Sequence, residues 1–277
     1  MTKNVHKTVL VNDTHISHDL GLKSDTALQK DKHSGFANRT QEIMWEGWKA
    51  FTKKNRDPDL LLLNGDLIDL LTISRQEDEM WTSNSGEMKA EAVKLMKMFG
   101  NPKKIIMIKG TSAHVDANHL TLERDIAEEL NAHRYRNRRL NNFALINLAP
   151  EGAPIPQVYH VTHHMSTTTG WYRGTAPAKA MASLMLNESH FIDRRIWGKI
   201  VGIIRGHVHH MWYEESISRR MIVNGCWQGA TNWMIQKMPE TPPDIGGTVL
   251  YHHKDGDFHK ERFIVEVDKL RPPVMRG

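Results

Sequence analysis

The chain has 277 residues and a formal net charge of +5 at neutral pH. Hydrophobic residues make up 39% and charged residues 25%, a balance that excludes collagen-like and disordered chains and predicts a globular protein with a sizeable core. No run approaches the roughly 20 apolar residues of a membrane span, and the polar N-terminus lacks the apolar segment of a signal peptide. We therefore expect a cytoplasmic protein that does not contact a membrane.

The cysteine and histidine counts restrict the metal chemistry that is open to the chain. One cysteine, Cys226, stands beside 17 histidines. The lone thiol excludes a disulfide framework and a thiolate zinc site, so a bound metal must be held by histidine and carboxylate. The mildly basic charge permits a polyanionic partner, and residues 133–139 (HRYRNRR) are either a phosphate-contacting patch or a solvated charge run.

The first half of the chain alternates strand and helix patterns. Short apolar runs typical of buried strands occur at residues 8–12, 60–63 and 105–108. Apolar residues recur at helical spacing over residues 43–54, 87–99 and 120–130. This alternation predicts βαβ units, in which helices cover a sheet of parallel strands.

The second half of the chain is richer in strands. Strand patterns occur at residues 143–148, 157–162, 200–204, 221–225 and 262–268, and one helix is expected over 178–186. No internal repeat, low-complexity tract or Gly/Ser linker interrupts the sequence, so we expect one compact domain over residues 1–277. Sites in such folds collect at the carboxyl ends of the strands.

Side chains of the metal-ligand type follow several of these strands. They are Asp13 with His15, Asp66 with Asp69, His114, the pair His163 and His164, and His207 with His209. Residues two apart in an extended chain point the same way, so the members of the first and last pairs can each aim at one place. Imidazole and carboxylate suit Mn, Fe, Zn, Ni or Co, and a carboxylate can bridge two ions. Two ions about 3.5 to 4 Å apart can clamp a phosphate ester and deprotonate a bound water, which predicts hydrolytic chemistry.

The order of these motifs resembles that of the calcineurin-like metallophosphoesterase superfamily. That family carries DxH, GDxxD, GNH(D/E), H and GHxH. This chain carries DTH, GDLID, a glycine-led loop with His114, HH and GHVH between Asp13 and His209. Residues 224–227 (NGCW) resemble the small-residue strand that usually follows in the family. The resemblance implies an α/β four-layer sandwich in which helices flank two mixed β-sheets.

The same resemblance implies a centre with two divalent metal ions. One ion would be held by Asp13, His15, Asp66 and His209, and a second, to which Asp66 bridges, by His163 and His207. The family uses the first histidine of an HH pair, so His163 is preferred to His164. Asp69 is expected to orient a ligand or to cap a turn. Manganese is the preferred ion, before zinc, iron, nickel, cobalt or magnesium.

The third motif departs from the family pattern, because no asparagine follows Gly110. One interpretation keeps His114 as the general acid, with Thr111, Ser112 or a water in place of the asparagine oxygen. Another takes residues 118–119 (Asn-His) as the displaced pair. We prefer His114, because the asparagine of that pair precedes a predicted helix and suits its N-cap. The GTxxH arrangement also resembles a variant found in phage and prophage metallophosphoesterases.

The implied reaction is hydrolysis of a phosphate ester by a hydroxide that bridges the two ions at Asp66. His114 would protonate the leaving oxygen, and Arg173, in the polar loop 165–177, would stabilise charge on the phosphoryl group. The basic balance favours a phosphodiester, with a nucleotide or nucleic acid as a candidate substrate. The alternatives are a phosphomonoesterase of the same fold and a metal-binding scaffold module without turnover.

The other prominent side chains are interpreted as surface or packing residues. Histidines outside the motifs, among them His18 and His252, are expected at the surface, and Met181 and Met185 in the core. The aromatic residues that flank the motifs would either stack on a substrate or pack in the core. They are Trp171, Tyr172, Trp227 and Trp233.

Overall fold

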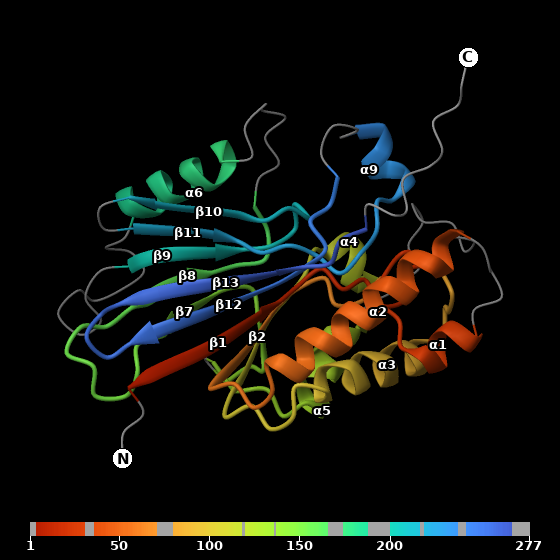
Figure 1. The fold of residues 1–277 in the computed structure, drawn as a ribbon, viewed down its shortest axis with the longest axis horizontal. Coiled ribbons are helices and arrows are strands. Elements are labelled where there is room, and N and C mark those ends of the chain that lie inside the picture. The colour runs from red at the N-terminus through yellow and green to blue at the C-terminus, as the bar shows by residue number, and fades with distance from the viewer. Residues whose placement is uncertain are drawn as a thin grey trace.

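Two β-sheets pack face to face in the computed structural model, and helices cover their outer faces (Figure 1). The structure describes residues 4–30, 36–70, 80–117, 120–135, 137–165, 174–187, 200–216, 219–237 and 242–267. The α/β class with two mixed sheets flanked by helices is therefore confirmed. Among the described residues, none of the helices combines the length and the apolar character that crossing a membrane requires.

The first sheet contains six strands in the order β13-β12-β1-β2-β3-β6. Their bounds are Val5–Val11 (β1), Leu60–Asn64 (β2), Ile105–Ile108 (β3), Leu140–Asn141 (β6), Gly246–His253 (β12) and Phe258–Ile264 (β13). Strands β1, β2, β3 and β6 run parallel, whereas β12 pairs antiparallel with both β1 and β13. The parallel strands bring their carboxyl ends to one edge of the sheet.

The second sheet contains five strands in the order β10-β11-β9-β8-β7. Their bounds are Ala144–Asn147 (β7), Val158–Val161 (β8), Ile200–Arg205 (β9), Trp212–Ser216 (β10) and Arg219–Val223 (β11). Strands β8, β9 and β11 run parallel, and the two edge strands run antiparallel to their neighbours. A small separate pair is formed by β4 (Asp116–Ala117) and β5 (Leu120–Thr121).

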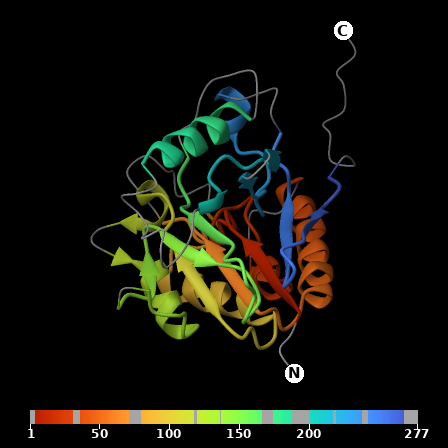
Figure 2. The same ribbon diagram turned by 90° about the vertical axis from the view of Figure 1, so that its left-hand side faces the viewer.

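The helices lie in two outer layers. The helices that contribute to the first sheet's outer layer are α1 (Asp25–Lys30), α2 (Phe36–Lys54), α3 (Ser85–Lys97) and α5 (Leu122–Glu129). Helix α6 (Thr175–Leu186) packs on the outer face of the second sheet, as Figure 2 shows from the side. The short helices α4 (Ser112–Val115) and α9 (Asn232–Lys237) follow motif strands of the two sheets.

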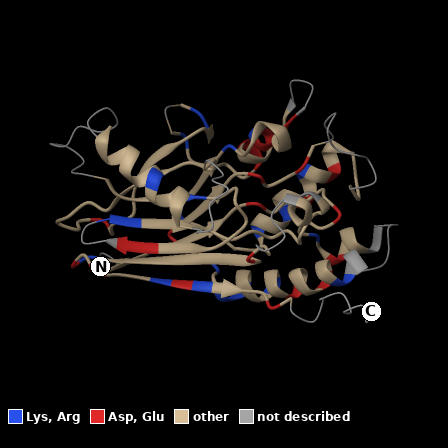
Figure 3. Cartoon of the chain, turned by 90° about the horizontal axis from the view of Figure 1, so that it is seen from above, with Lys and Arg blue, Asp and Glu red and all other residues tan. Residues whose placement is uncertain are grey.

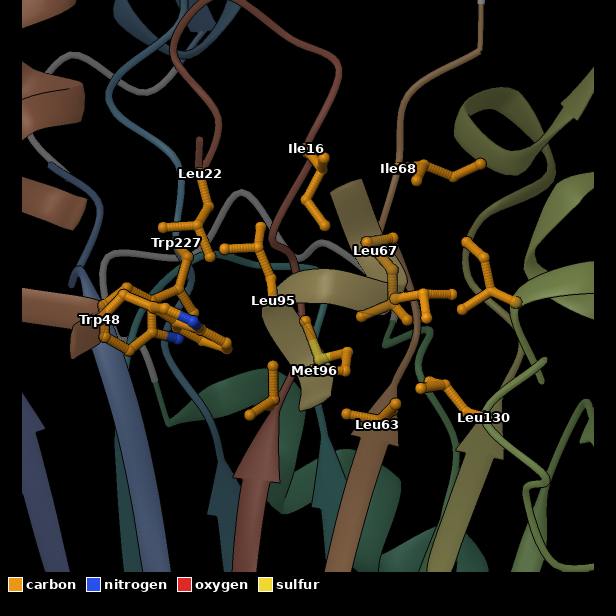
Figure 4. Packing of buried hydrophobic residues seen from close by; sticks show 14 of the residues in the cluster. Ile16, Leu22, Trp48, Leu63, Leu67, Ile68, Leu95, Met96, Leu130 and Trp227 are labelled. Atoms are coloured by element: carbon orange, nitrogen blue, oxygen red, sulfur yellow. The ribbon is translucent and has the colours of Figure 1, made fainter. Parts of the chain in front are cut away.

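Buried apolar side chains fill the space between the two sheets and the space between each sheet and its helices. In β1, Val9 and Val11 face the helices, and Leu10 faces the second sheet, because successive side chains of a strand alternate. Figure 4 shows part of the helix-side layer. In that layer Trp48 of α2 packs edge to face on Trp227 with ring centroids 4.8 Å apart. Trp227 is fully buried, so it is a core residue.

The predicted strands and helices of the first half agree with the structure in position, with two differences. Residues 16–40, expected as a polar connection, include α1 and the start of α2. The helix predicted over 120–130 begins at Leu122, because Leu120 and Thr121 pair as β5 with β4.

Three surface and core expectations are wrong. His252 and His18 are buried, with exposed fractions of 0% and 4%, and Met185 is 48% exposed. His252 lies on β12, a central strand that the sequence patterns did not reveal, and its Nε2 is 3.0 Å from the Tyr159 hydroxyl. The pair of histidines at 252–253, followed by a lysine and an aspartate, resembles a surface turn in sequence, but β12 lies inside the sheet between β13 and β1.

Charges of both signs are interspersed over the surface elements in the view of Figure 3. Within residues 133–139, Arg134 and Arg138 are exposed and Arg139 is paired with Glu128 at 2.8 Å. One arginine of this tract, Arg139, is therefore already paired with a carboxylate. The role of the tract as a phosphate-contacting patch stays a prediction.

We predict that His252 makes the folded protein sensitive to acid. Burial, with a smaller contribution from Arg220, lowers the pKa of His252 to about 3. Below pH 6.5 the unfolded chain gains a proton that the folded chain does not bind, so stability falls on acidification and is unaffected above pH 6.5. Between pH 7 and pH 5 this loss is up to about 2 kcal/mol.

Urea unfolding at several pH values, with chelator present throughout, measures this effect. The variant His252→Gln should lose less stability than wild type between pH 7 and pH 5. His259→Gln, a replacement of an exposed histidine on the neighbouring strand β13, is the matched control. Equal pH slopes for wild type and His252→Gln would contradict the prediction.

Candidate metal centre

The motif residues of both sheets meet at the carboxyl ends of their strands. Asp13 and His15 follow β1, Asp66 follows β2, and residues 110–114 follow β3. From the second sheet, residues 163–164 follow β8 and residues 207–209 follow β9. Asp13 links the sheets, because its Oδ2 accepts a 2.9 Å hydrogen bond from the His207 amide. The five motifs therefore form one site.

Backbone hydrogen bonds continue beyond the strands and hold the motif loops against each other. The amides of Asp13, His15 and Ile16 donate to the carbonyls of Gly65, Asp66 and Leu67 at 3.0 to 3.1 Å. The Gly206 amide donates to the His163 carbonyl at 3.1 Å in the same way. The loops are thus ordered extensions of the sheets.

Left-handed backbone conformations are concentrated in the candidate ligands. Among the described residues, eight non-glycine residues have positive φ, and the motif members are Asp13 (50°), His15 (42°), Asp66 (49°), His207 (74°) and His209 (55°). This conformation costs about 1 to 2 kcal/mol for an L-residue. Such strain gathers at functional sites, where surrounding structure enforces it. Here hydrogen bonds between the loops hold the strained residues.

The first cluster consists of Asp13, His15 and His209. The Nε2 atoms of the two imidazoles face each other at 3.2 Å, and Asp13 Oδ1 lies 3.3 Å from His209 Nε2. Asp13 is fully buried, and its Oδ1 has no hydrogen-bond partner within the described structure. Opposed imidazole nitrogens beside an unsatisfied buried carboxylate oxygen fit a divalent cation.

The second cluster consists of Asp66, His163 and His207. Asp66 Oδ2 lies 2.9 Å from His163 Nε2 and 4.0 Å from His207 Nδ1. The Nδ1 of His163 faces the Asn64 carbonyl at 2.5 Å, an arrangement that directs Nε2 toward the carboxylate. This cluster also offers the histidine and carboxylate donors that first-row divalent metals accept.

Asp13 joins the two clusters. Its Oδ1 lies 3.7 Å from His163 Nε2 as well as near His209, so this oxygen faces both clusters. The bridging role of Asp66 stays a prediction. The structure brings together all six predicted ligands, and it places His163 inside the site and the exposed His164 outside it, against the His207 ring at 4.6 Å.

Burial of the carboxylates is offset by two of the imidazoles, those of His15 and His163, and these imidazoles in turn lower the pKa values of Asp13 and Asp66. Burial lowers the pKa of His15, but Asp69 and Asp13 more than offset it and raise this pKa to about 9. Burial likewise opposes the effect of Asp66 and Asp13 on His163, whose pKa also rises to about 9. A divalent cation would replace these protons as the counter-charge.

Asp69 lies beside two histidines of the site, and its predicted role in orienting a ligand stays a prediction. Its Oδ1 lies 3.0 Å from His15 Nδ1 and 2.7 Å from His114 Nδ1, and the carboxylate is fully buried. The Asp69 amide donates to Ser17 Oγ at 2.9 Å, which fixes the backbone of the carboxylate. Burial is the main cause that lowers the pKa of the partly exposed His114.

Several other predicted residues lie outside the metal clusters or outside the described part of the chain. Arg173, Trp171, Tyr172 and the pair 118–119 lie outside the described residues, as does the Trp233 side chain. Cys226 is buried and its Sγ donates to the Gln228 carbonyl at 3.3 Å. Burial raises the pKa of this thiol to about 12.

Two glycines allow the loops to approach closely. Gly65 has a φ of +81°, and a Cβ there would lie 2.6 Å from the His163 ring. A Cβ at Gly110 would collide with the backbone nitrogen and Oδ1 of Asp66. The glycines that precede Asp66 and Thr111 therefore permit the second cluster to close.

Glu123 is a site residue that the sequence patterns missed. Its side chain lies in the first turn of α5, is fully buried, and accepts hydrogen bonds from the amides of Leu67 (3.0 Å) and Gly110 (2.8 Å). It thus connects two motif loops from behind. Burial, reinforced by Asp66, raises the pKa of Glu123 to about 7. The available signal was a glutamate on the same helix face as Ile126 and Ala127, where an apolar residue is expected.

Comparisons with known proteins give distant structural likenesses. No family model and no curated protein matches the chain. An archaeal phosphodiesterase is 12% identical over 92% of this chain and 99% of its own, with a TM-score of 0.43. Vps29 from Chaetomium thermophilum is 9% identical over 96% and 100%, with a TM-score of 0.46. Vps29 from Entamoeba histolytica, complexed with Zn²⁺, is 11% identical over 94% and 99%, with a TM-score of 0.40.

These values are too low to assign a family or an activity.

We predict that Glu123→Gln weakens metal binding by about tenfold or more, in line with other residues that support metal ligands. A glutamine oxygen can accept only one of the two amide hydrogens, and its NH₂ group would oppose the other. Calorimetric titration of chelator-treated protein with Mn²⁺ measures this change. The matched control is Glu91→Gln, because Glu91 is also buried and accepts a 2.7 Å backbone hydrogen bond, from Ser24. Equal loss of affinity in both variants would show that Glu123 acts through general stability alone.

Proposed function

We propose that this protein is a metal-dependent phosphoesterase of the calcineurin-like type, with two divalent ions at the meeting point of its sheets. The observation that carries the proposal is the pair of His/Asp clusters joined through Asp13 Oδ1. Manganese is the proposed ion, and the histidine and carboxylate donors also accept zinc, iron, nickel, cobalt or magnesium. When bound, two such ions clamp phosphoryl oxygens and make water a nucleophile at neutral pH.

The chain's own residues would hold and orient this centre. Asp13, His15 and His209 would bind the first ion, and Asp66, His163 and His207 the second, with Asp66 as the proposed bridge. Asp69 holds His15 through Nδ1 and so directs Nε2 at the ion position. The interlocked loops keep the donors in place before an ion arrives.

His114 would protonate the leaving oxygen. Asp69 faces its Nδ1 at 2.7 Å, so in the imidazolium the transferable proton is the one on Nε2. The lowered pKa of His114 favours release of that proton near neutral pH. Arg173 is the proposed cation for the phosphoryl oxygens, on the basis of its place in the loop after the HH pair.

The proposed substrate is a phosphodiester. Its support is the basic net charge of +5, which favours an anionic partner. A phosphomonoester is the alternative within the same chemistry, and the absence of an asparagine after Gly110 favours a metal-binding module without turnover as the alternative to an enzyme.

Hydrolysis assays separate these possibilities. Manganese-loaded protein should cleave bis(p-nitrophenyl) phosphate faster than p-nitrophenyl phosphate, and chelator should abolish both activities. Asp66→Asn should lower kcat/KM by at least about 100-fold, because the second cluster loses its charged oxygen. Asp257→Asn, at an exposed turn, is the control. If metal-loaded protein cleaves neither ester nor any nucleic acid, the enzyme proposal fails.

His114→Ala tests the proton donor separately. Turnover should fall by about 10² to 10⁴, the usual contribution of a general acid, while metal content remains that of wild type. Activity assays combined with elemental analysis measure both quantities, and His259→Ala, at an exposed histidine of β13, is the control. Loss of bound metal from His114→Ala would instead identify His114 as a ligand.

A further inference from the structure

Among the described residues, the histidine and carboxylate donors of the second cluster include none from the loop that follows β3. These donors are Asp66 Oδ2, His163 Nε2 and His207 Nδ1. Manganese accepts up to six donors and favours oxygen among them, so further oxygen ligands suit this position. The loop that begins at Gly110 lies directly against Asp66, as the close approach of Gly110 to its carboxylate shows.

Thr111 turns its hydroxyl toward this cluster. Its Oγ1 lies 3.1 Å from His207 Nδ1, the atom that faces Asp66. Its backbone amide donates to Asp66 Oδ1 at 2.6 Å, so the same residue contacts two members of the cluster. The Thr111 amide therefore fixes Oδ1 of Asp66 by a hydrogen bond, and Oδ2 of the same carboxylate faces His163 and His207.

The Thr111 hydroxyl does not cap the helix that follows it. Thr111 is the N-cap residue of α4, where a threonine hydroxyl commonly accepts a hydrogen bond from the first turn. No such capping bond is formed by its side chain. The hydroxyl therefore points into the metal cluster at the expense of a cap.

The position of Thr111 is fixed on both sides. The preceding residue, Gly110, donates its amide to the buried Glu123 carboxylate at 2.8 Å. The following turn is closed by hydrogen bonds from the amides of His114 and Val115 to the Thr111 carbonyl, at 2.8 and 3.1 Å. The neighbouring hydroxyl, that of Ser112, is exposed.

We infer that the Thr111 hydroxyl is an oxygen ligand of the second metal ion, in place of a side-chain amide. The inference rests on the proposed two-ion centre and specifies one of its ligands. With Asp66 as the proposed bridge, the first ion would have two carboxylates and two imidazoles as ligands. The second would have one carboxylate, two imidazoles and this neutral hydroxyl, which is a weaker donor, so the second ion is held less tightly than the first. The protein therefore fills and empties its two positions at different metal concentrations.

Metal titration of threonine variants tests this ligand directly. Chelator-treated protein is titrated with Mn²⁺ by calorimetry, and free Mn²⁺ is counted by electron paramagnetic resonance. Wild type should bind two ions with distinct affinities. Thr111→Val, which keeps the shape and removes the hydroxyl, should raise the Kd of the weaker ion at least about tenfold and change the tighter one less than about twofold.

Further variants make the result specific to the hydroxyl. Thr111→Ser keeps the oxygen and should bind within about threefold of wild type, and Thr111→Asn should bind the weaker ion as tightly as wild type or more tightly. Ser112→Ala, the matched control at the adjacent exposed hydroxyl, should leave both affinities unchanged. Circular dichroism of each metal-free variant confirms that it is folded.

The outcomes distinguish this inference from the proposed function. Wild type that binds fewer than two ions would overturn the two-ion centre itself. Two ions in wild type with unchanged binding in Thr111→Val would overturn only the threonine ligand, with a water in its place. Weakened binding in Ser112→Ala but not in Thr111→Val would overturn it in favour of Ser112.

Discussion

Three fully buried carboxylates, those of Asp13, Asp66 and Asp69, lie within one small volume at the edge of the sheets. Burying even one charge without a partner is costly, so this group requires positive charge beside it. His15 and His163 supply it, and their raised pKa values are the result. The same cost of buried negative charge acts on Glu123, whose pKa is raised by burial and by the nearby Asp66.

The repulsion among these buried carboxylates explains why hydrogen bonds connect the backbones of the motif loops. Carboxylates that repel one another stay together only if their loops cannot separate. The pairing of the loops after β1 and β2, and the bonds from Glu123 to Leu67 and Gly110, resist that separation. Left-handed residues of the site are held in the same way, because the amides of Asp13, His15 and His207 donate to groups of other motif loops.

The sequence predicted the parts of the molecule that depend on local pattern. Apolar runs located β1, β2 and β3, and ligand-type residues at their ends marked the candidate site, because parallel strands deliver their carboxyl ends to one edge. Strand β12 was missed, because its His252 and His253 resemble a polar turn until the antiparallel partners β1 and β13 are known. Glu123 and Thr111 were not resolved because their roles depend on loops that are distant in sequence or on the direction of one hydroxyl.

The burial of Cys226 has a practical consequence for handling the protein. Its thiol lies in the interior near the carbonyl of His209, and its raised pKa keeps it protonated at any ordinary pH. Thiolates are the species that react with oxidants and alkylating agents, so this cysteine is protected from both. Purification can therefore omit dithiothreitol and similar reductants, whose own thiolates bind transition metals and would compete with the histidines for the ions under study.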